Sequence, residues 1–231
     1  MKKYELTAEF IEKWGKKLFR IKALISFGSV EAGELGGYVE KEDNLAQDGD
    51  AWVCDDAWVY GNARVYDDAW VYGDARVYGN ARVYGDARVC DDAWVYGNAE
   101  VYGDARVYGN ARVCDDAWVY GNARVYGNAR VYGNAWVCDD AWVYGNADYL
   151  LIGRIGSRFS FTTFFKNKDK GITVSCGCFL GTIAEFRAKV TDTHGNNKHA
   201  KMYNLAADMA ELQILGEEHF DKLNTNKSEP F

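Results

Sequence analysis

The sequence predicts a mostly β protein built around a parallel β-helix of about six coils, with an N-terminal β cap and a small C-terminal α+β domain. A valine stands at every sixth position from Val53 to Val143 without one insertion, which makes sixteen hexads. An alanine stands two places before each of these valines. An amphipathic helix requires apolar residues at spacings of three and four, and a flat strand requires strict alternation, so a period of six fits neither. Three hexads would make one triangular coil of 18 residues.

Each position of the hexad has an expected place in such a coil. The valine points inward from the middle of a short strand, and the alanine points inward near the corner, where only a small side chain fits. Gly-Asn and Gly-Asp form most corners, because Gly and Asn tolerate the positive φ of a sharp turn. At Asp55-Asp56 and Asp115-Asp116 the corner has to form without glycine. The coils stack about 4.8 Å apart as parallel strands, and each buried valine contributes about 1.5–3 kcal/mol.

Changes in composition divide the chain into four segments. Residues 1–44 are expected to form N-terminal strands and a helix cap, and residues 45–148 the β-helix. Residues 149–220 are expected to form the α+β domain, and residues 221–231 a flexible tail.

The N-terminal segment is expected to close one end of the β-helix. Short strands are expected over residues 4–7 and 17–24. Lys41 and Gln47 then occupy valine positions. Polar residues there are expected of a terminal cap that meets water and ends the strand pairing.

The C-terminal segment predicts a β-hairpin followed by two helices. Residues 157–166 and 172–179 are rich in β-forming residues and flank the turn NKDKG. Thr182 and Glu185 form a capping box for a helix over residues 183–193. A second helix, over residues 198–215, is expected to carry on its apolar face Tyr203, Leu205, Met209, Leu212 and Leu215.

Charge and composition exclude some classes of function. The net charge of −7 argues against a protein that holds nucleic acid by its phosphates. Residues 45–148 contain eight Arg, no Lys and seventeen Asp or Glu, a net charge of −9. No run of 18 apolar residues predicts a membrane span. The first ten residues lack an apolar signal region, which favours the cytoplasm and reduced thiols for the six cysteines.

The outward positions give three faces, and none is uniformly aromatic or basic. One face carries Trp52, Trp70, Arg88, Arg106, Arg124 and Trp142. The second carries Trp58, Arg76, Trp94, Arg112, Arg130 and Asp148. The third carries Arg64, Arg82, Glu100, Trp118 and Trp136. A flat ligand-binding array would repeat one residue type along one face, and this chain does not.

Two interpretations of these side chains stay open. Stacked Tyr and Arg side chains can form a solvated surface ladder. Trp, Tyr and Arg are also the residues that interfaces favour. The candidate binding surface consists of Trp52, Trp70, Trp118, Trp136, Trp142, Arg88, Arg106 and Arg124.

The cysteines within the repeat predict no metal site and no disulfide. The hexad VCDDAW begins at Val53, Val89, Val113 and Val137, and its last three copies are 24 residues apart. Because 24 is not a multiple of 18, Cys90, Cys114 and Cys138 fall on three different faces. These thiols are interpreted as small side chains in place of tyrosine. Residues 45–148 contain no His, Ser, Thr or Lys, so no general base and no catalytic residue is expected there.

The C-terminal segment holds the one set of side chains with possible chemistry. Cys176, Cys178, His194 and His199 could ligate zinc, or a Cys–His pair could act as nucleophile and base. Cys176 and Cys178 also point to the same side of a strand, where thiols commonly pack as small apolar groups. Neither spacing is diagnostic, and no cofactor is expected.

From Leu45 to about Asp148, the hexads resemble hexapeptide-repeat proteins of the left-handed parallel β-helix class. This resemblance implies the handedness, and it implies a homo-oligomer, most often a trimer with the helices side by side. Trp52 with Trp70, and Trp118 with Trp136, would then anchor contacts between chains. Many such proteins are acyltransferases, so an enzyme that uses His194 or Cys178 is an alternative.

The whole chain resembles a group of uncharacterised phage and prophage proteins. The motifs that carry this resemblance are GELGGYVEKEDNL, IGSRFSFTTFF, VSCGCFLGTIAEF and THG. It implies a viral context in a bacterial cytoplasm and transfers no catalytic residue. The expected function is therefore a non-enzymatic binding protein that blocks or sequesters a component of host defence, with a host protein or a small molecule as partner. A structural self-assembling rod is a further alternative.

Overall fold

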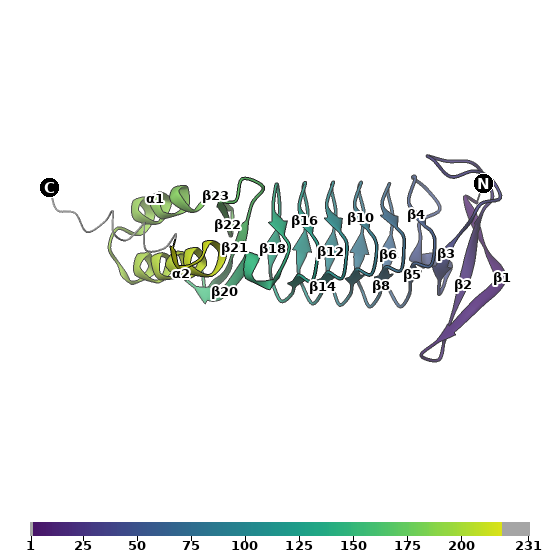
Figure 1. Ribbon diagram of the computed structural model, residues 1–231, viewed down its shortest axis with the longest axis horizontal. Coiled ribbons are helices and arrows are strands. Elements are labelled where there is room, and N and C mark those ends of the chain that lie inside the picture. The colour runs from purple at the N-terminus through teal and green to yellow at the C-terminus, as the bar shows by residue number, and fades with distance from the viewer. Residues whose placement is uncertain (1, 219–231) are drawn as a thin grey trace.

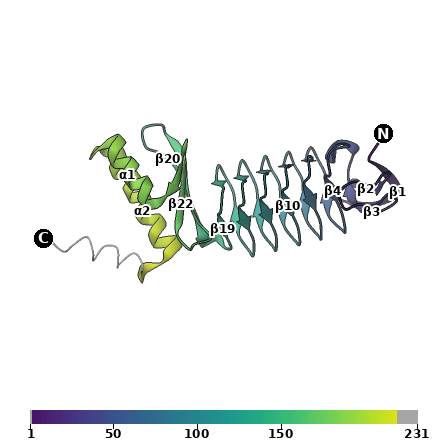
Figure 2. The same cartoon turned by 90° about the horizontal axis from the view of Figure 1, so that it is seen from above.

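The computed structural model describes residues 2–218, and the expected tail over residues 221–231 lies outside them. The described chain forms an elongated rod with three parts (Figure 1). A β cap lies at the N-terminal end, a stack of coils forms the middle, and a sheet with two helices lies at the far end. The view from above shows the same order, with both helices beyond the sheet (Figure 2).

The coils confirm the predicted β-solenoid of about six turns. Each hexad contributes one two-residue strand, and strands 18 residues apart pair in parallel, as Val53 does with Val71. The strands are β4 (Trp52–Val53), β5 (Trp58–Val59), β6 (Arg64–Val65), β7 (Trp70–Val71), β8 (Arg76–Val77), β9 (Arg82–Val83), β10 (Arg88–Val89), β11 (Trp94–Val95), β12 (Glu100–Val101), β13 (Arg106–Val107), β14 (Arg112–Val113), β15 (Trp118–Val119), β16 (Arg124–Val125), β17 (Arg130–Val131), β18 (Trp136–Val137) and β19 (Trp142–Val143).

These strands form three parallel sheets, which are the three faces that the 18-residue coil predicts. The first face has the order β19-β16-β13-β10-β7-β4. The second face contains β5-β8-β11-β14-β17, and the third has the order β18-β15-β12-β9-β6.

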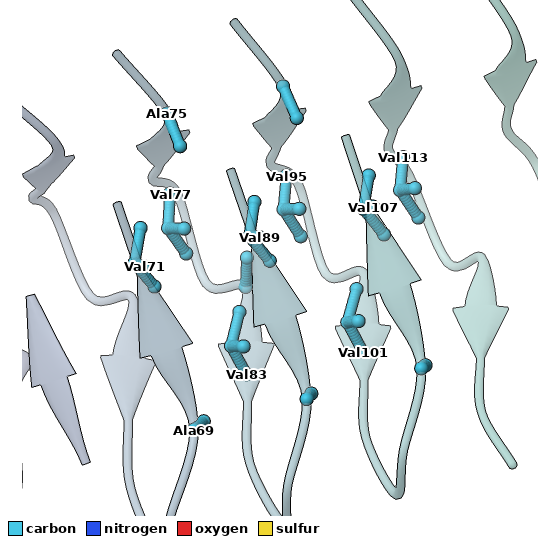
Figure 3. Packing of buried hydrophobic residues seen from close by; sticks show 14 of the residues in the cluster. Ala69, Val71, Ala75, Val77, Val83, Val89, Val95, Val101, Val107 and Val113 are labelled. Carbon is cyan, nitrogen blue, oxygen red and sulfur yellow. The ribbon is translucent and has the colours of Figure 1, made fainter. Parts of the chain in front are cut away.

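The interior of the solenoid is built from valine and alanine. Every repeat valine from Val53 to Val143 has an exposed fraction of 0%, and so has every alanine that precedes it by two places. Figure 3 shows these side chains in successive layers inside the coils. The inward positions predicted for both residues are therefore confirmed.

Aspartate can replace glycine at the corners because its carboxylate accepts a hydrogen bond from the next coil, which glycine cannot do. Asp55 and Asp115 take positive φ values of 55° and 59°, in the left-handed region that Asp tolerates better than most residues. The Asp55 Oδ2 accepts a hydrogen bond from the backbone N–H of Gly73 in the next coil at 3.1 Å. The Asp115 Oδ2 accepts one from Gly133 at 3.2 Å. The carboxylate thus joins two coils at a corner.

The N-terminal cap is a hairpin of β1 (Tyr4–Lys13) and β2 (Lys16–Ala23), joined to β3 (Leu35–Val39). Strands occur where they were expected, and β1 continues further than predicted. The β3 strand pairs in parallel with β5, so the cap extends the second face. Lys3 is 2% exposed, and its Nζ donates hydrogen bonds to the carbonyl oxygens of Asp48, Gly49 and Ala51. The backbone N–H of Lys3 donates to Gln47 Oε1 at 2.8 Å. Polar groups therefore close this end of the core.

One candidate surface residue is inside this cap. Trp52 has an exposed fraction of 0%, because the rings of Tyr4 and Phe27 pack edge-on against it at 6.4 and 5.4 Å. The expectation that Trp52 lies on an open face is wrong. Its strand position points out of the coil, but residues from the N-terminal segment cover it.

The C-terminal part is an antiparallel sheet in the order β20-β21-β22-β23, followed by two helices. The predicted hairpin and both helices are confirmed, and the Thr182–Glu185 capping box forms. Strands β20 and β23 were not predicted. The elements are β20 (Tyr149–Ile155), β21 (Ser160–Lys166), β22 (Ile172–Cys176), β23 (Phe179–Thr182), α1 (Ile183–His194) and α2 (Lys198–Leu215).

The predicted apolar face of α2 is confirmed at Tyr203 and in part at Leu215, which packs against the core of the C-terminal part, and it is wrong at the other three residues. Leu205, Met209 and Leu212 are exposed to 63%, 56% and 45%. The buried face carries mainly small side chains, which allow the helix to approach the sheet closely. That face consists of Ala200, Tyr203, Ala206, Ala207, Ala210, Glu211 and Ile214.

Arg187 of α1 joins the two helices by ion pairs. Its Nη2 lies 2.7 Å from both Asp208 Oδ1 and Glu211 Oε2 of α2. Glu211 is buried, so the guanidinium supplies the partner that a buried carboxylate requires. Within residues 2–218, no helix is long and apolar enough to cross a membrane.

Candidate ligand-binding cleft

Tyrosine rings stack in columns along the outside of the solenoid. The residue after each repeat valine is Tyr or Cys, and these residues lie above one another every 18 positions. The rings of Tyr60, Tyr78 and Tyr96 stack on the second face at 5.0 and 4.9 Å, with planes within 4° of parallel. On the third face, Tyr66, Tyr84, Tyr102 and Tyr120 continue at 4.8–5.0 Å. The columns therefore have a fixed spacing of one ring per coil.

Beside the second-face column, arginine and tryptophan alternate. Arg76 lies between the rings of Trp58 and Trp94, at 4.5 and 5.0 Å from their centroids. Arg112 lies over the other side of Trp94 at 4.5 Å. These contacts are cation–π interactions, with tryptophan as the ring partner in place of the tyrosine that the surface ladder was expected to use.

The candidate surface residues lie on two faces and do not form one patch. On the first face, Trp70 is half-buried, Arg88 and Arg106 are exposed, and the Arg124 guanidinium lies 5.4 Å from the ring of Trp142. On the third face, Trp118 and Trp136 stack at 5.3 Å with planes 8° apart. Their predicted adjacency is confirmed, while contact between chains through Trp118 and Trp136 stays a prediction. The buried Trp52 cannot make such a contact.

Cysteine interrupts each tyrosine column at a different height. Cys54 and Cys90 stand in the first-face column, Cys114 in the second and Cys138 in the third, as predicted. Burial raises the pKa of the Cys114 thiol, and it raises the pKa of Cys138 to about 11. These thiols are therefore protonated near neutral pH and poor nucleophiles.

A cleft of about 720 Å³ opens where the second face meets the C-terminal sheet. One wall comes from the last coils and the other from β20 and the end of α2. The residues that line this junction cleft are Tyr96, Arg112, Cys114, Asp115, Arg130, Tyr132, Asn146, Tyr149, Leu150, Leu151 and Gln213. Its volume lies in the range of small-molecule sites.

Two arginines give the junction cleft positive charge. Arg112 and Arg130 pair directly across β14 and β17, so their Cα atoms are about 4.8 Å apart by the strand spacing. Neither forms an ion pair with a residue in the described part of the chain. Asp148 was expected to follow them on this face, but it pairs with Lys166 at 3.2 Å. The Asp115 carboxylate also lines the cleft and is engaged by Gly133 N–H.

Hydrogen bonds fix the far wall of the cleft. The Gln213 Nε2 of α2 donates to the Tyr149 carbonyl oxygen at 2.7 Å, which holds the helix against β20. The Arg130 backbone N–H donates to Asn146 Oδ1 at 2.9 Å. The rings of Tyr132 and Tyr149 meet edge to face at 6.3 Å and 85°. The solenoid and the C-terminal sheet are thus tied together at this point.

The predicted Cys–His set lies elsewhere and does not form a common metal site. His194 and His199 have ring centroids 5.8 Å apart, and His194 also stacks on Tyr203 at 5.8 Å. Cys178 is exposed, whereas Cys176 is half-buried and accepts a hydrogen bond from Thr162. No group of three or more His, Cys, Asp or Glu side chains suited to a metal ion occurs among residues 2–218.

Only one wall of the junction cleft could be predicted from the sequence. The break at Cys114 in the tyrosine column was visible, and so was the Arg112–Arg130 row. The second wall was not, because β20 was not predicted and the coils do not indicate where the C-terminal sheet lies.

The parallel coils, the three sheets and the valine–alanine interior define a β-solenoid repeat protein. The family model described as the YdcK beta solenoid repeat matches this chain at residues 57–73, 75–91, 99–115, 105–121, 117–133 and 123–139. All of these matches lie within the coils. No curated protein matches the chain.

Proposed function

We propose that this β-solenoid is a non-enzymatic binding protein that holds an anionic ligand in the junction cleft. The observation that carries the proposal is the pair Arg112 and Arg130, two arginines of adjacent coils that line one cleft, without a carboxylate paired to either in the described chain. Like charges in adjacent coils repel each other, and a bound anion would relieve that repulsion through charge-assisted hydrogen bonds.

The chemistry of the cleft favours binding over catalysis. A hydrogen bond with Cys114 and burial raise the pKa of Tyr96 to about 12. Burial raises the pKa of Tyr149 and of the Cys114 thiol. General acid–base catalysis works best with a pKa near the operating pH, and none of these groups is held there. His194 and Cys178, the candidates for an acyltransferase-like activity, do not line this cleft.

The resemblance to phage and prophage proteins supplies a context for the proposal. In a bacterial cytoplasm, a rigid protein with an anion-binding cleft would act by sequestering an anionic component of host defence. The rod shape supports such a role, because stacked coils hold one wall of the cleft in a fixed position before a ligand binds.

Ligand capture from a bacterial lysate, followed by native mass spectrometry of the intact protein, tests the proposal. We expect a bound anion that is lost from the double variant Arg112→Gln, Arg130→Gln. The matched control is Arg88→Gln, Arg106→Gln, which removes an equivalent pair from the first face. Equal capture by both double variants would contradict the proposal. Turnover of an acyl donor that His194→Ala abolishes would favour the enzyme instead.

A further inference from the structure

We infer that the ligand of the junction cleft carries a planar aromatic ring, which inserts between Tyr96 and Tyr132 while its anionic group binds Arg112 and Arg130. This combination is the chemistry of a single nucleotide. The inference rests on the proposed function and adds the class of ligand.

The first argument is the spacing of the tyrosine column. Tyr78 and Tyr96 stack at 4.9 Å, and the next position of the column is Cys114, which has no ring. Tyr132 follows in the coil after that, so Tyr96 and Tyr132 belong to coils about 9.6 Å apart by the strand spacing. A guest ring midway between them would lie about 5 Å from each, within the range of aromatic stacking. The gap between Tyr96 and Tyr132 therefore has the width that one stacked aromatic ring requires.

The second argument is that no neighbouring tyrosine ring stacks on Tyr96 at this position, where the small, 9% exposed Cys114 lines the cleft. Tyr132 is 55% exposed. Tyr149 meets it edge to face, at 85°, and does not continue the stack. Where no cysteine intervenes, the rings stack without a gap, as on the third face from Tyr66 to Tyr120.

The third argument is the place of the arginines beside the open ring position. Residues two apart on a strand point to the same side, so Arg112 lies beside Cys114 and Arg130 beside Tyr132. All four residues line the same cleft. A ligand ring in the column thus has its anionic substituent next to the guanidiniums. The cleft volume of about 720 Å³ suits one nucleotide, and the acidic solenoid disfavours a long polyanion.

The first face contains a matched site that serves as a control, because it has the same interrupted tyrosine column but does not line the junction cleft. Cys90 interrupts its column between Tyr72 and Tyr108, and Arg88 and Arg106 stand beside it. The residues repeat those at Cys114, but β20 and α2 do not line that position. It therefore offers the same local chemistry without the second wall.

Calorimetric titration of the full chain with four ribonucleoside monophosphates, a nucleoside and inorganic phosphate tests the inference. We expect at least one monophosphate to bind, and to bind more tightly than either phosphate or the nucleoside alone. Cys114→Tyr fills the ring position and should weaken that binding about tenfold or more, the effect expected from lost base–aromatic stacking. Phosphate binding should remain. Cys90→Tyr should leave all affinities unchanged.

Other outcomes separate the inference from the function on which it rests. One outcome is that lysate capture depends on Arg112 and Arg130 while no monophosphate binds more tightly than phosphate. In that case the inference of an aromatic ring is wrong, and the proposed anion-binding function is retained. If capture does not depend on the arginines, both are wrong. Tyr132→Leu gives a second test that leaves Cys114 in place, and unchanged monophosphate affinity in that variant would also overturn the inference.

A different observation carries a second proposal: the exposed stripe Met202, Leu205, Met209 and Leu212 of α2 pairs with the same stripe of a second copy. Their spacings of three, four and three residues are those of a coiled-coil seam. In an antiparallel pair, each Met would face a Leu of the other chain. Exposed apolar patches of this kind mark interaction sites.

The charges at the two ends of α2 favour this antiparallel pairing. Lys198 and Lys201 are exposed at its start, and Glu217 and Glu218 are exposed just past its end. Around a two-fold axis, the start of one helix lies beside the end of the other, so opposite charges meet. A parallel pair would place like charges together.

Light scattering at micromolar concentration tests the pairing. We expect twice the chain mass of 26.0 kDa, and a single-chain mass for the variant Leu205→Lys, Met209→Lys. Leu180→Lys, at an exposed leucine of β23, is the control and should keep the double mass. A single-chain mass for the unaltered protein would overturn the proposal. A triple mass unaffected by the α2 variant would do the same and favour the side-by-side trimer.

Discussion

The carboxylate of Asp91 accepts a hydrogen bond from the backbone N–H of Gly109, the residue 18 positions later in the next coil, at 2.9 Å. Asp91 takes a φ of 57°, so one residue both forms the corner and joins it to the next. At each of the other corners where Asp is followed by a further coil, Asp55, Asp67 and Asp115, the residue 18 positions later is also Gly, as Gly73 is for Asp55. Two carboxylates never occupy this position in successive coils.

Asp91→Ala should lower the free energy of unfolding by about 1–3 kcal/mol, because alanine loses the bond and is strained in the left-handed region. Asp91→Asn should cost less, since Asn keeps an acceptor and tolerates the same φ. Asp92→Ala, next to it, is the control. Urea unfolding followed by circular dichroism measures all three, and equal stability of the Asp91→Ala and Asp92→Ala variants would contradict this account.

Val95→Ala should destabilise the solenoid by about 2–3 kcal/mol, through lost burial and the cavity left behind. Ala93→Val, at the corner of the same coil, should cost about 1–3 kcal/mol because there is no room for two more methyl groups. Both residues have an exposed fraction of 0%. Thermal unfolding of each variant checks this, and a Tm equal to that of the parent protein would show that the layer can repack.

The stability of the protein should fall as the pH rises from about 10 to about 12. Burial raises the pKa of Tyr60 to about 12, and a hydrogen bond with Cys90, with burial, raises that of Tyr72 to about 12. Unfolded tyrosine titrates near 10. A raised pKa means that the folded state holds the proton more tightly, so the contribution is complete below pH 10 and is lost as pH passes 12. Tyrosinate absorbance should rise late and together with unfolding, and an early rise without unfolding would be the opposite result.

Cys90→Tyr should stabilise the solenoid by about 0.5–1.5 kcal/mol, because it restores the missing ring between Tyr72 and Tyr108. The same corner accepts tyrosine elsewhere, as Tyr66 precedes Asp67 and Asp68. Cys90→Ser serves as the control, since it supplies no ring. A lower urea midpoint for Cys90→Tyr than for Cys90→Ser would show that the column has no room there.

The regular part of the fold could be predicted because its sequence code is local. One hexad fixes the inward positions of Val and Ala, and the absence of insertions fixes every strand partner, such as Trp118 with Trp136. The faces and the break at Cys114 follow from the same period.

The parts that could not be predicted depend on contacts between distant segments. Trp52 has the outward position of its hexad, yet Tyr4 and Phe27 cover it. On α2, Leu205 looks like a core residue, but close approach to the sheet selects the alanines instead. The junction cleft requires β20 beside the last coils, which no hexad encodes.

Because a coil contains three hexads, the number of hexads sets the angle by which the C-terminal sheet is rotated about the solenoid axis relative to the N-terminal cap. Adding one hexad would advance the C-terminal sheet by about 1.6 Å, a third of the strand spacing, and turn it by a third of a revolution. Another face would then supply the wall opposite β20. The 24-residue spacing of Cys90, Cys114 and Cys138 is four hexads, so duplication of such a unit changes the phase as well as the length. The place of an insertion therefore decides its effect. One or two hexads inserted between Arg130 and Tyr149 would remove the two arginines from the wall opposite β20, whereas hexads inserted before Tyr96 would leave the cleft as it is and turn only the N-terminal cap.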